Sequence, residues 1–177
     1  MLGSDMENVR PFMRVTPIVL ALSLALVSAC GGSGEEARDI GTSVPPNAEG
    51  TSPPGRLTIK AATASSGGES AAFVFDHLDR LWNSGSVAPG WIQVDLGQPT
   101  AITKVRLYTE QNPPGPTSHQ ILGGLSPDSL VPLGTLDGDT ASGQWLELQV
   151  NGNVRYVRIA TLKSPSWVAW REIEIYE

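Results

Sequence analysis

Cysteine and histidine are scarce in this sequence. Cys30 is the only cysteine, so no disulfide can form within the chain and no thiol-rich metal site is available. The two histidines, His77 and His119, stand far apart and lack the spacing of metal ligands. The sequence also lacks a Gly-x-Ser-x-Gly elbow, a His-Glu-x-x-His motif and a phosphate-binding glycine loop with a lysine. These absences argue against an enzyme.

Charged side chains are also few. They make up 17% of the chain, and the formal net charge is -6. Nucleic-acid binding needs a clustered lysine and arginine surface that neutralises phosphates, so a nucleic-acid partner is not expected. In contrast, the chain holds 19 glycines and 14 prolines. Turn-forming residues at this frequency favour many short strands over long helices, and hence an all-β protein.

The apolar runs of the sequence are too short to cross a bilayer comfortably, which takes about 20 residues. One such run, residues 17–29 (PIVLALSLALVSA), follows Arg10 and Arg14 and ends in small residues, as a secretory signal peptide does. We therefore expect residues 1–29 to be a signal peptide that directs Sec-type export.

Cys30 completes the string V-S-A-C, which resembles the bacterial lipobox. The resemblance implies that Cys30 receives the lipid and that the lipid chains are the protein's only membrane anchor. Because Gly31 rather than aspartate follows the cysteine, the outer membrane of the cell envelope is favoured. The alternative is a buried free cysteine that happens to follow a signal peptide.

Residues 31–55 contain almost no large apolar side chains and are rich in Gly, Ser, Pro and Glu. Such a segment cannot bury enough surface to offset its ordering entropy, so we expect residues 30–55 to be the lipidated cysteine and a flexible tether. As a random coil, the tether would hold a domain on the order of 25–30 Å from the membrane. Residues 56–177 then remain for one folded domain, which we expect to be a monomer.

Apolar and polar residues alternate with period two through most of residues 56–177. In residues 91–96 (WIQVDL), for example, Ile92, Val94 and Leu96 fall on one face. Turn residues separate nearly all of the alternating segments. Strands are predicted at Leu57–Ala64, Trp91–Leu96, Ile102–Thr109, His119–Leu125, Leu130–Leu136, Gln144–Gln149, Tyr156–Thr161 and Trp170–Tyr176.

This series of short strands, without an amphipathic helix of useful length, predicts an all-β fold: an antiparallel β-sandwich or jelly roll. Residues 70–78 could add a turn of helix. Three strings carry a further signal, because LWNSGSVAPGWIQVDLGQPTAITKVRL, VRYVRIA and WREIEIY resemble the discoidin, or coagulation factor type C, domain in order and spacing. The resemblance covers about residues 57–177 and implies a galactose-binding-like antiparallel β-sandwich with jelly-roll topology.

Three tryptophans are expected to pack within the folded domain, and one turn is expected to end a strand. Trp82 and Trp91 bracket a glycine-rich loop and are expected as core anchors, because each ring can bury a large apolar area. Trp170, in the last strand, is expected to pack in the core or on the sheet surface. Asp95 and Gly97 are expected to close a strand in a turn, where Asp bonds its own backbone and Gly takes a positive φ.

A structural calcium ion is the cofactor that the resemblance implies. In this family the ion often binds a loop aspartate and a glutamate of the last strand, and the matching positions are Asp76, Asp79 and Glu172. Two departures weaken the match, because His77 replaces the usual glycine and Leu81 stands where a threonine is common. The alternative is that the two aspartates are solvated turn residues.

The ligand surface implied by the resemblance consists of loops at one end of the sandwich. Sugar C–H faces pack on aromatic rings, and sugar hydroxyls bond Asn, Gln, Arg and His side chains. Loops 83–89, 110–118 and 164–168 offer such groups. The candidate ligand-binding residues are Asn83, Gln111, Asn112, His119 and Trp167.

Alternatives stay open for two of these candidates. The turn S-P-S-W should push the ring of Trp167 outward, but the ring could instead fold back and plug the end of the sandwich. His119 could be a ligand or a hydrogen-bonded histidine at a strand edge. The arginine that clamps a sugar hydroxyl in galactose-binding members has no clear match near Glu110 and Gln111, which does not favour galactose itself.

The family includes bacterial family-32 carbohydrate-binding modules as well as lipid-binding and protein-binding domains. The expected function is therefore that of a cell-envelope lipoprotein whose domain binds an extracellular ligand, with carbohydrate as the expected partner. The alternative is an adhesion module that binds a surface protein through an apolar hot spot centred on Trp167. A hydrolase using Asp76 is a third hypothesis.

Overall fold

A computed structural model describes residues 53–177 of the chain. The predicted signal peptide, Cys30 and the part of the predicted tether up to residue 52 lie outside these residues. Within residues 53–177, no helix combines the length and the apolar character needed to cross a membrane.

The described chain forms an antiparallel sheet of seven strands and one short 3-10 helix. The elements, in chain order, are β1 (Ala61–Ala64), the 3-10 helix (Gly68–Phe75), β2 (Trp82–Val87), β3 (Gly90–Thr109), β4 (Gly115–Ser126), β5 (Ser129–Thr140), β6 (Trp145–Lys163) and β7 (Trp167–Tyr176). In the sheet the strands follow the order β2-β7-β3-β6-β4-β5, and β1 pairs with β3.

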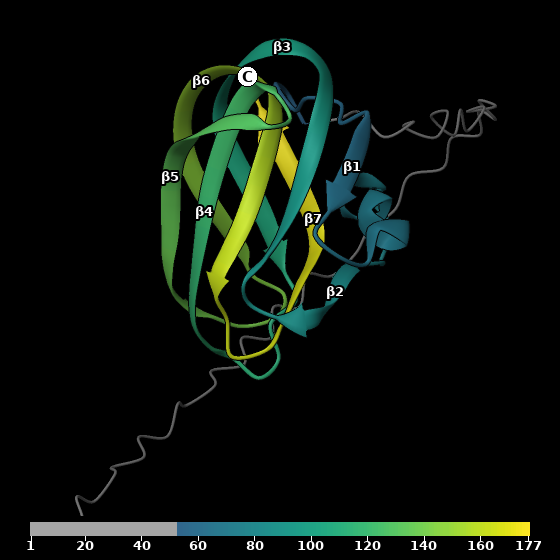
Figure 1. The fold of residues 1–177 in the computed structure, drawn as a ribbon, viewed down its shortest axis with the longest axis vertical. Coiled ribbons are helices and arrows are strands. Elements are labelled where there is room, and N and C mark those ends of the chain that lie inside the picture. The colour runs from purple at the N-terminus through teal and green to yellow at the C-terminus, as the bar shows by residue number, and fades with distance from the viewer. Residues whose placement is uncertain (1–52) are drawn as a thin grey trace, which may run out of the picture. The chain divides into compact units, whose positions relative to one another are not determined.

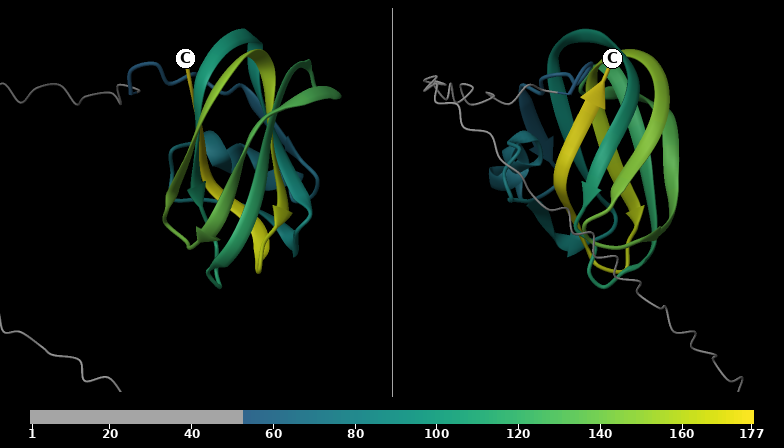
Figure 2. Two further views of the ribbon diagram at one scale, coloured as in Figure 1. Left: turned by 90° about the vertical axis from the view of Figure 1, so that its left-hand side faces the viewer. Right: turned by 180° about the vertical axis from the view of Figure 1, so that it is seen from behind.

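Strands β3 and β6 are long enough to belong to both layers of a sandwich. The pairing between them is interrupted after Asp95 and resumes at Thr100, which pairs with Val154. The first part of β3 pairs with β1, whereas its last residues pair with β7. Likewise, β4 pairs only with the second half of β6. Both strands bend over the same end of the domain, so one hydrogen-bonded sheet closes onto itself as two packed layers (Figure 1, and from the side in Figure 2). The predicted antiparallel β-sandwich is confirmed.

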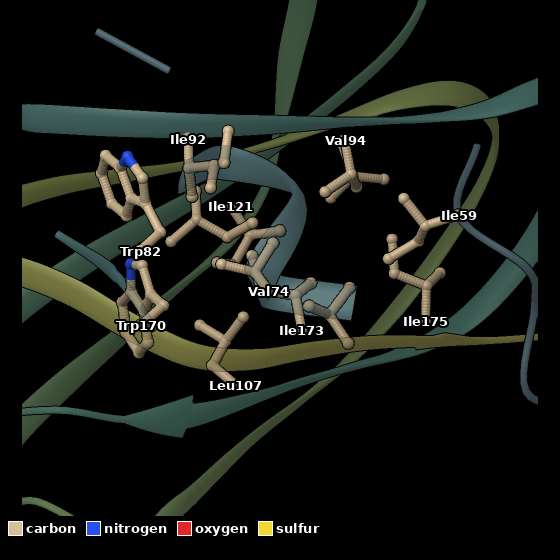
Figure 3. Packing of buried hydrophobic residues seen from close by; sticks show 14 of the residues in the cluster. Ile59, Val74, Trp82, Ile92, Val94, Leu107, Ile121, Trp170, Ile173 and Ile175 are labelled. Atoms are coloured by element: carbon tan, nitrogen blue, oxygen red, sulfur yellow. The ribbon is translucent and has the colours of Figure 1, made fainter. Parts of the chain in front are cut away.

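Alternate side chains of the strands fill the space between the layers. Ile92 and Val94 are fully buried, as their alternation predicts. Trp82 and Trp170, which pair across β2 and β7, lie at the same end of the apolar cluster (Figure 3). Burying each large aliphatic side chain of this cluster contributes about 1.5–3 kcal/mol. Trp91 differs from the prediction because it is only half-buried, and the guanidinium of Arg158 lies 4.3 Å from the centre of its ring.

The number of strands differs from the prediction for two reasons. The predicted pairs of strands at 91–96 and 102–109, and at 144–149 and 156–161, are continuous in β3 and β6 because each chain bends without leaving the sheet. In addition, β2 was predicted as a loop. Its sequence, WNSGSV, lacks apolar alternation, and only its pairing with β7 makes it a strand.

The turn predicted at Asp95 and Gly97 is confirmed. Gly97 has a φ of 84°, and its N–H donates to Asp95 Oδ1 over 2.7 Å. Arg155 adds a bidentate ion pair to the same carboxylate, at 2.8 and 2.9 Å. This hydrogen-bonded guanidinium holds the pKa of Asp95 below its ordinary value.

The two ends of the described chain lie side by side. The Glu177 N–H donates to the Gly55 carbonyl over 3.0 Å, and the Leu57 N–H donates to the Ile175 carbonyl over 2.8 Å. Because β7 has 10 residues, its first residue, Trp167, lies about 30 Å from these ends. The chain therefore enters the domain at the end opposite to the one where β7 begins (Figure 1).

Candidate functional site

Four connections gather at the end of the sandwich where β7 begins, at the lower edge of Figure 1. They join β2 to β3 (88–89), β3 to β4 (110–114), β5 to β6 (141–144) and β6 to β7 (164–166). We call this end the loop end. The antiparallel register of the strands brings these connections together, although they are far apart in the sequence.

A groove of about 380 Å³ opens at the loop end. It lies between β2, the start of β7 and two of the connections. Its lining residues are Asn83, Val87, Glu110, Asn112, Pro113, Pro165, Ser166, Trp167 and Ala169. The groove thus combines one aromatic ring, two amides and one carboxylate with apolar side chains, which is a composition suited to a ligand that has both C–H faces and hydroxyl groups.

Trp167 is the prominent aromatic residue of the groove. Its side chain is 56% exposed, so the turn before it turns the ring outward as predicted and does not plug the sandwich. Within this turn the Ser166 N–H donates to Ser164 Oγ over 3.2 Å. Across the β2–β7 pair, Val87 lies opposite Trp167, and Asn83 lies opposite Ala169. The strand β2 therefore supplies one wall of the groove.

Gln111 does not lie in the groove, contrary to the prediction. It is buried, and both ends of its amide are used within the protein. Its Nε2 donates to the Pro113 carbonyl over 3.0 Å, and its Oε1 lies 3.0 Å from the Ser164 hydroxyl. Gln111 thus holds two loops of the groove to each other, and its neighbour Asn112 is exposed in the lining.

His119 also lies beneath the groove and not on its surface, because its position in β4 points it inward. Its side chain is 3% exposed, its Nδ1 lies 3.0 Å from Thr161 Oγ1, and its ring meets Trp170 edge-on at 4.8 Å. Burial lowers the pKa of His119 to about 4, a shift that the negative charge of Asp137 only partly opposes. The residue is therefore a neutral part of the packing below the site.

The charge of the groove comes from Glu110, whose neighbours include a second carboxylate. Arg171 Nε donates to Glu110 Oε2 over 2.6 Å, and Arg171 Nη1 donates to Asp79 Oδ1 over 2.5 Å. The hydrogen bond to Glu110 raises the pKa of the guanidinium above its ordinary value. Two carboxylates thus share one guanidinium, which leaves one net negative charge beside the groove.

Two of the three predicted calcium ligands come together on the 3-10 helix side of β7. Oδ2 of Asp76 and Oε1 of Glu172 are buried oxygens that lack a well-aligned hydrogen-bond donor. Arg80 approaches the first oxygen at 2.6 Å, and His77 approaches the second at 2.8 Å, as ion-pair contacts. Burial, and then the charges of Glu174 and Asp76, raise the pKa of Glu172 to about 8.

These carboxylates fit a hard cation as oxygen donors. The third predicted ligand does not join them, because Asp79 is 93% exposed and pairs with Arg171. Residues 53–177 contain no group of three or more His, Cys, Asp and Glu side chains placed to hold a metal ion. The backbone of His77 keeps a left-handed conformation, with a φ of 57°, at the position where the family usually has glycine.

Several groove residues escaped the sequence-based prediction. Val87 and Ser166 are not of the residue types expected to bind a sugar. Glu110 was mentioned only because the arginine that clamps a sugar hydroxyl in galactose-binding members has no match near it. The signal that could have found Glu110 is its place directly after the predicted strand that ends at Thr109, two residues before the predicted Asn112. Its partner Arg171 lies 61 residues away and is brought to it only by the fold.

The fold and the groove define a class of protein: antiparallel β-sandwich domains with an open groove formed by their end loops. The model of the F5/8 type C domain matches residues 58–173 of the chain. This protein therefore belongs to the F5/8 type C, or discoidin, domain family, and the resemblance seen in the sequence is confirmed. No curated protein matches the chain.

Solved structures with the same fold include carbohydrate-binding modules. The family-32 module of AlyQ, in complex with 4,5-unsaturated mannuronic acid, is 21% identical, with a TM-score of 0.59, over 69% of this chain and 98% of that one. The family-32 module of Clostridium perfringens NanJ, in complex with galactose, is 14% identical, with a TM-score of 0.57, over 66% of this chain and 93% of that module. Chitosan-binding module 1 of a Paenibacillus sp. IK-5 chitosanase/glucanase is 24% identical, with a TM-score of 0.55, over 68% and 96%.

The buried His119 leads to a test of the packing beneath the groove. The fold favours the neutral ring, so the stability it contributes is present above pH 6.5 and is lost as the pH falls toward about 4. At pH values well below 4, where the ring is protonated in both the folded and the unfolded state, this loss amounts to about 3 kcal/mol. We expect the free energies of unfolding of the wild type and His119→Gln, measured with denaturant from pH 8 to pH 4, to converge as the pH falls. Parallel curves would show that His119 is not held neutral.

Proposed function

We propose that the domain binds carbohydrate in the groove at its loop end. The observation that carries this proposal is the exposed ring of Trp167 beside the polar side chains of Asn83 and Asn112. An exposed ring gives a sugar a face on which its C–H groups pack, while amides at the rim bond its hydroxyls. The solved modules with this fold, which are in complex with mannuronic acid and galactose, support the same ligand class.

The domain acts by binding and not by catalysis in this proposal. The one carboxylate of the groove, Glu110, is in an ion pair, and the lining holds no histidine or cysteine. The hydrolase hypothesis placed Asp76 at the reacting centre. Asp76 does not line this groove, because it lies beside the 3-10 helix and pairs with Arg80.

The exposed apolar surface around Trp167 supports a second candidate function. Val87 is 57% exposed and lies opposite Trp167, so the two side chains form a small apolar area. Such an area suits a protein partner as an interface hot spot. The same variant therefore tests both functions, and the identity of the ligand separates them.

The test of carbohydrate binding is Trp167→Ala. We expect the folded wild-type domain to bind one or more glycans on an array, and the variant to bind the best of them about tenfold more weakly, because the stacking platform is gone. The matched control is Trp145→Ala, since Trp145 is 38% exposed, stacks on Tyr108 and is not among the residues that line the groove. Affinities measured by calorimetry should be unchanged in this control. A folded wild-type domain that binds no glycan would favour a protein partner.

We also propose that the domain is displayed on the cell envelope by a lipid on Cys30. The position of residues 53–56 supports this arrangement, because they enter the domain about 30 Å from Trp167, at the opposite end. A tether attached there leaves the groove open to the surroundings. The predicted lipobox that ends at Cys30 is the second observation that supports the lipid anchor.

Replacement of the lipid acceptor tests the anchor. We expect the full-length chain, expressed in a bacterium with lipoprotein processing, to fractionate with membranes and to be released by detergent. Cys30→Ser should move it to the soluble fraction, because the acyl chains supply the attachment. Retention of Cys30→Ser in the membrane fraction would contradict the proposed anchor.

A structural calcium ion at Asp76 and Glu172 is a further part of the proposal. The ion would stabilise the loop before β2 by binding Asp76 Oδ2 and Glu172 Oε1, two buried oxygens whose partners are the side chains of Arg80 and His77. We expect millimolar CaCl2 to raise the midpoint of thermal unfolding, by an amount equivalent to about 1.4 kcal/mol at ten times the dissociation constant. The rise should disappear in Glu172→Gln. An equal rise in both proteins would place the ion elsewhere, and no rise would exclude the site.

A further inference from the structure

The charge around the groove limits which sugars it can accept, if it binds sugars as proposed. Glu110 is the only ionisable residue in the lining. Its side chain is 25% exposed, so its charge is only partly screened by solvent. The exposed Lys163, which ends β6 just before the loop at 164–166, is not part of the lining.

The ion pair does not cancel the negative charge. Arg171 is shared between Glu110 and Asp79, so three charged groups leave a net charge of one negative unit. One oxygen of Glu110, Oε2, accepts from Arg171, and the other, Oε1, accepts from the Ser142 hydroxyl over 3.1 Å. A carboxylate oxygen has two lone pairs, so Oε1 can accept a second donor.

Three classes of sugar meet this charge differently. A uronate would bring its carboxylate close to Glu110, and no cation in the lining would compensate the repulsion. A neutral sugar would form hydrogen bonds with the rim amides and stack on Trp167, with neither attraction nor repulsion between net charges. A protonated amino sugar would add a charge-assisted hydrogen bond to Glu110, and such bonds are stronger than neutral ones. The net charge of -6 on the whole chain also attracts a cationic polymer.

We propose that Glu110 makes the groove selective for glycans with free amino groups over uronate glycans. This inference rests on the proposed carbohydrate binding and adds the ligand class. It distinguishes the ligand of this domain from that of the similar AlyQ module, which is in complex with 4,5-unsaturated mannuronic acid. It places the ligand in the chemical class named for the Paenibacillus module, a polymer with free amines.

The experiment compares three sets of oligosaccharides of equal length: glucosamine, N-acetylglucosamine and mannuronate oligomers. Affinities are measured by calorimetry at low salt, in a buffer with a calcium chelator. We expect glucosamine oligomers to bind about fivefold or more tightly than their acetylated counterparts, because acetylation removes the charge and keeps the ring. Mannuronate oligomers should bind most weakly.

Glu110→Gln should remove the preference for the free amine, so that glucosamine oligomers and their acetylated counterparts bind this variant with similar affinities. Asp128→Asn is the matched control, because it removes one exposed charge in the β4–β5 connection, at the end where the chain enters. It should keep the full preference. Asp79→Asn tests the shared charge without touching the groove lining, and a smaller loss of preference is expected because Arg171 then pairs with Glu110 alone.

The possible outcomes distinguish a failure of the amine selectivity from a failure of carbohydrate binding itself. If acetylated or acidic oligomers bind the wild type as tightly as glucosamine oligomers, the selectivity is refuted while carbohydrate binding stands. If no oligomer and no arrayed glycan binds, carbohydrate binding and the selectivity fall together. If Glu110→Gln fails to fold, as judged by thermal unfolding, Asp79→Asn decides, and an unchanged preference in that variant refutes the role of the charge.

Discussion

The pairing of β3 with β6 along both layers is the constraint on which the rest of the domain depends. Because each strand bends from one layer into the other, the apolar side chains of each strand line the same interior over its whole length, from Ile92 to Leu107 in β3. The bends occupy one end of the sandwich. The strands that start and finish at the other end therefore leave their connections there, and these connections form the groove.

The groove is held in shape by polar groups that lie beneath it and do not line it. Gln111 joins the loop at 110–114 to the loop at 164–166, while Thr109 Oγ1 lies 2.6 Å from the Ala141 carbonyl and ties in the loop at 141–144. Buried hydrogen bonds of this kind are costly to break because each orphaned group loses its solvation. Loops fixed in this way would hold Trp167 in place and so limit the loss of conformational entropy in the proposed binding.

Two glutamates of β7 show how strongly local partners decide the state of a buried acid. Glu172 and Glu174 stand two residues apart, and both are almost fully buried. For Glu174, burial is overcome by hydrogen bonds from Tyr176 and Arg56, which hold its pKa below the ordinary value. For Glu172, burial and the charges of Glu174 and Asp76 outweigh the hydrogen bond from the His77 backbone, and its pKa is raised to about 8. The carboxylate of Glu174 joins the two ends of the described chain through its ion pair with Arg56, whereas Glu172 contacts the His77 ring.

Period-two alternation and the string from Leu81 to Leu107 were enough to determine the sandwich, its family and the turn at Asp95, because these depend on residues close together in the chain. The outward position of Trp167 also followed from its local turn. The sequence could not place Gln111 and His119, because whether a polar residue is buried depends on what packs over it. Nor could it show β2 as a strand or Glu110 beside Arg171. Those features arise only when strands distant in sequence pair, and that pairing is a property of the tertiary structure.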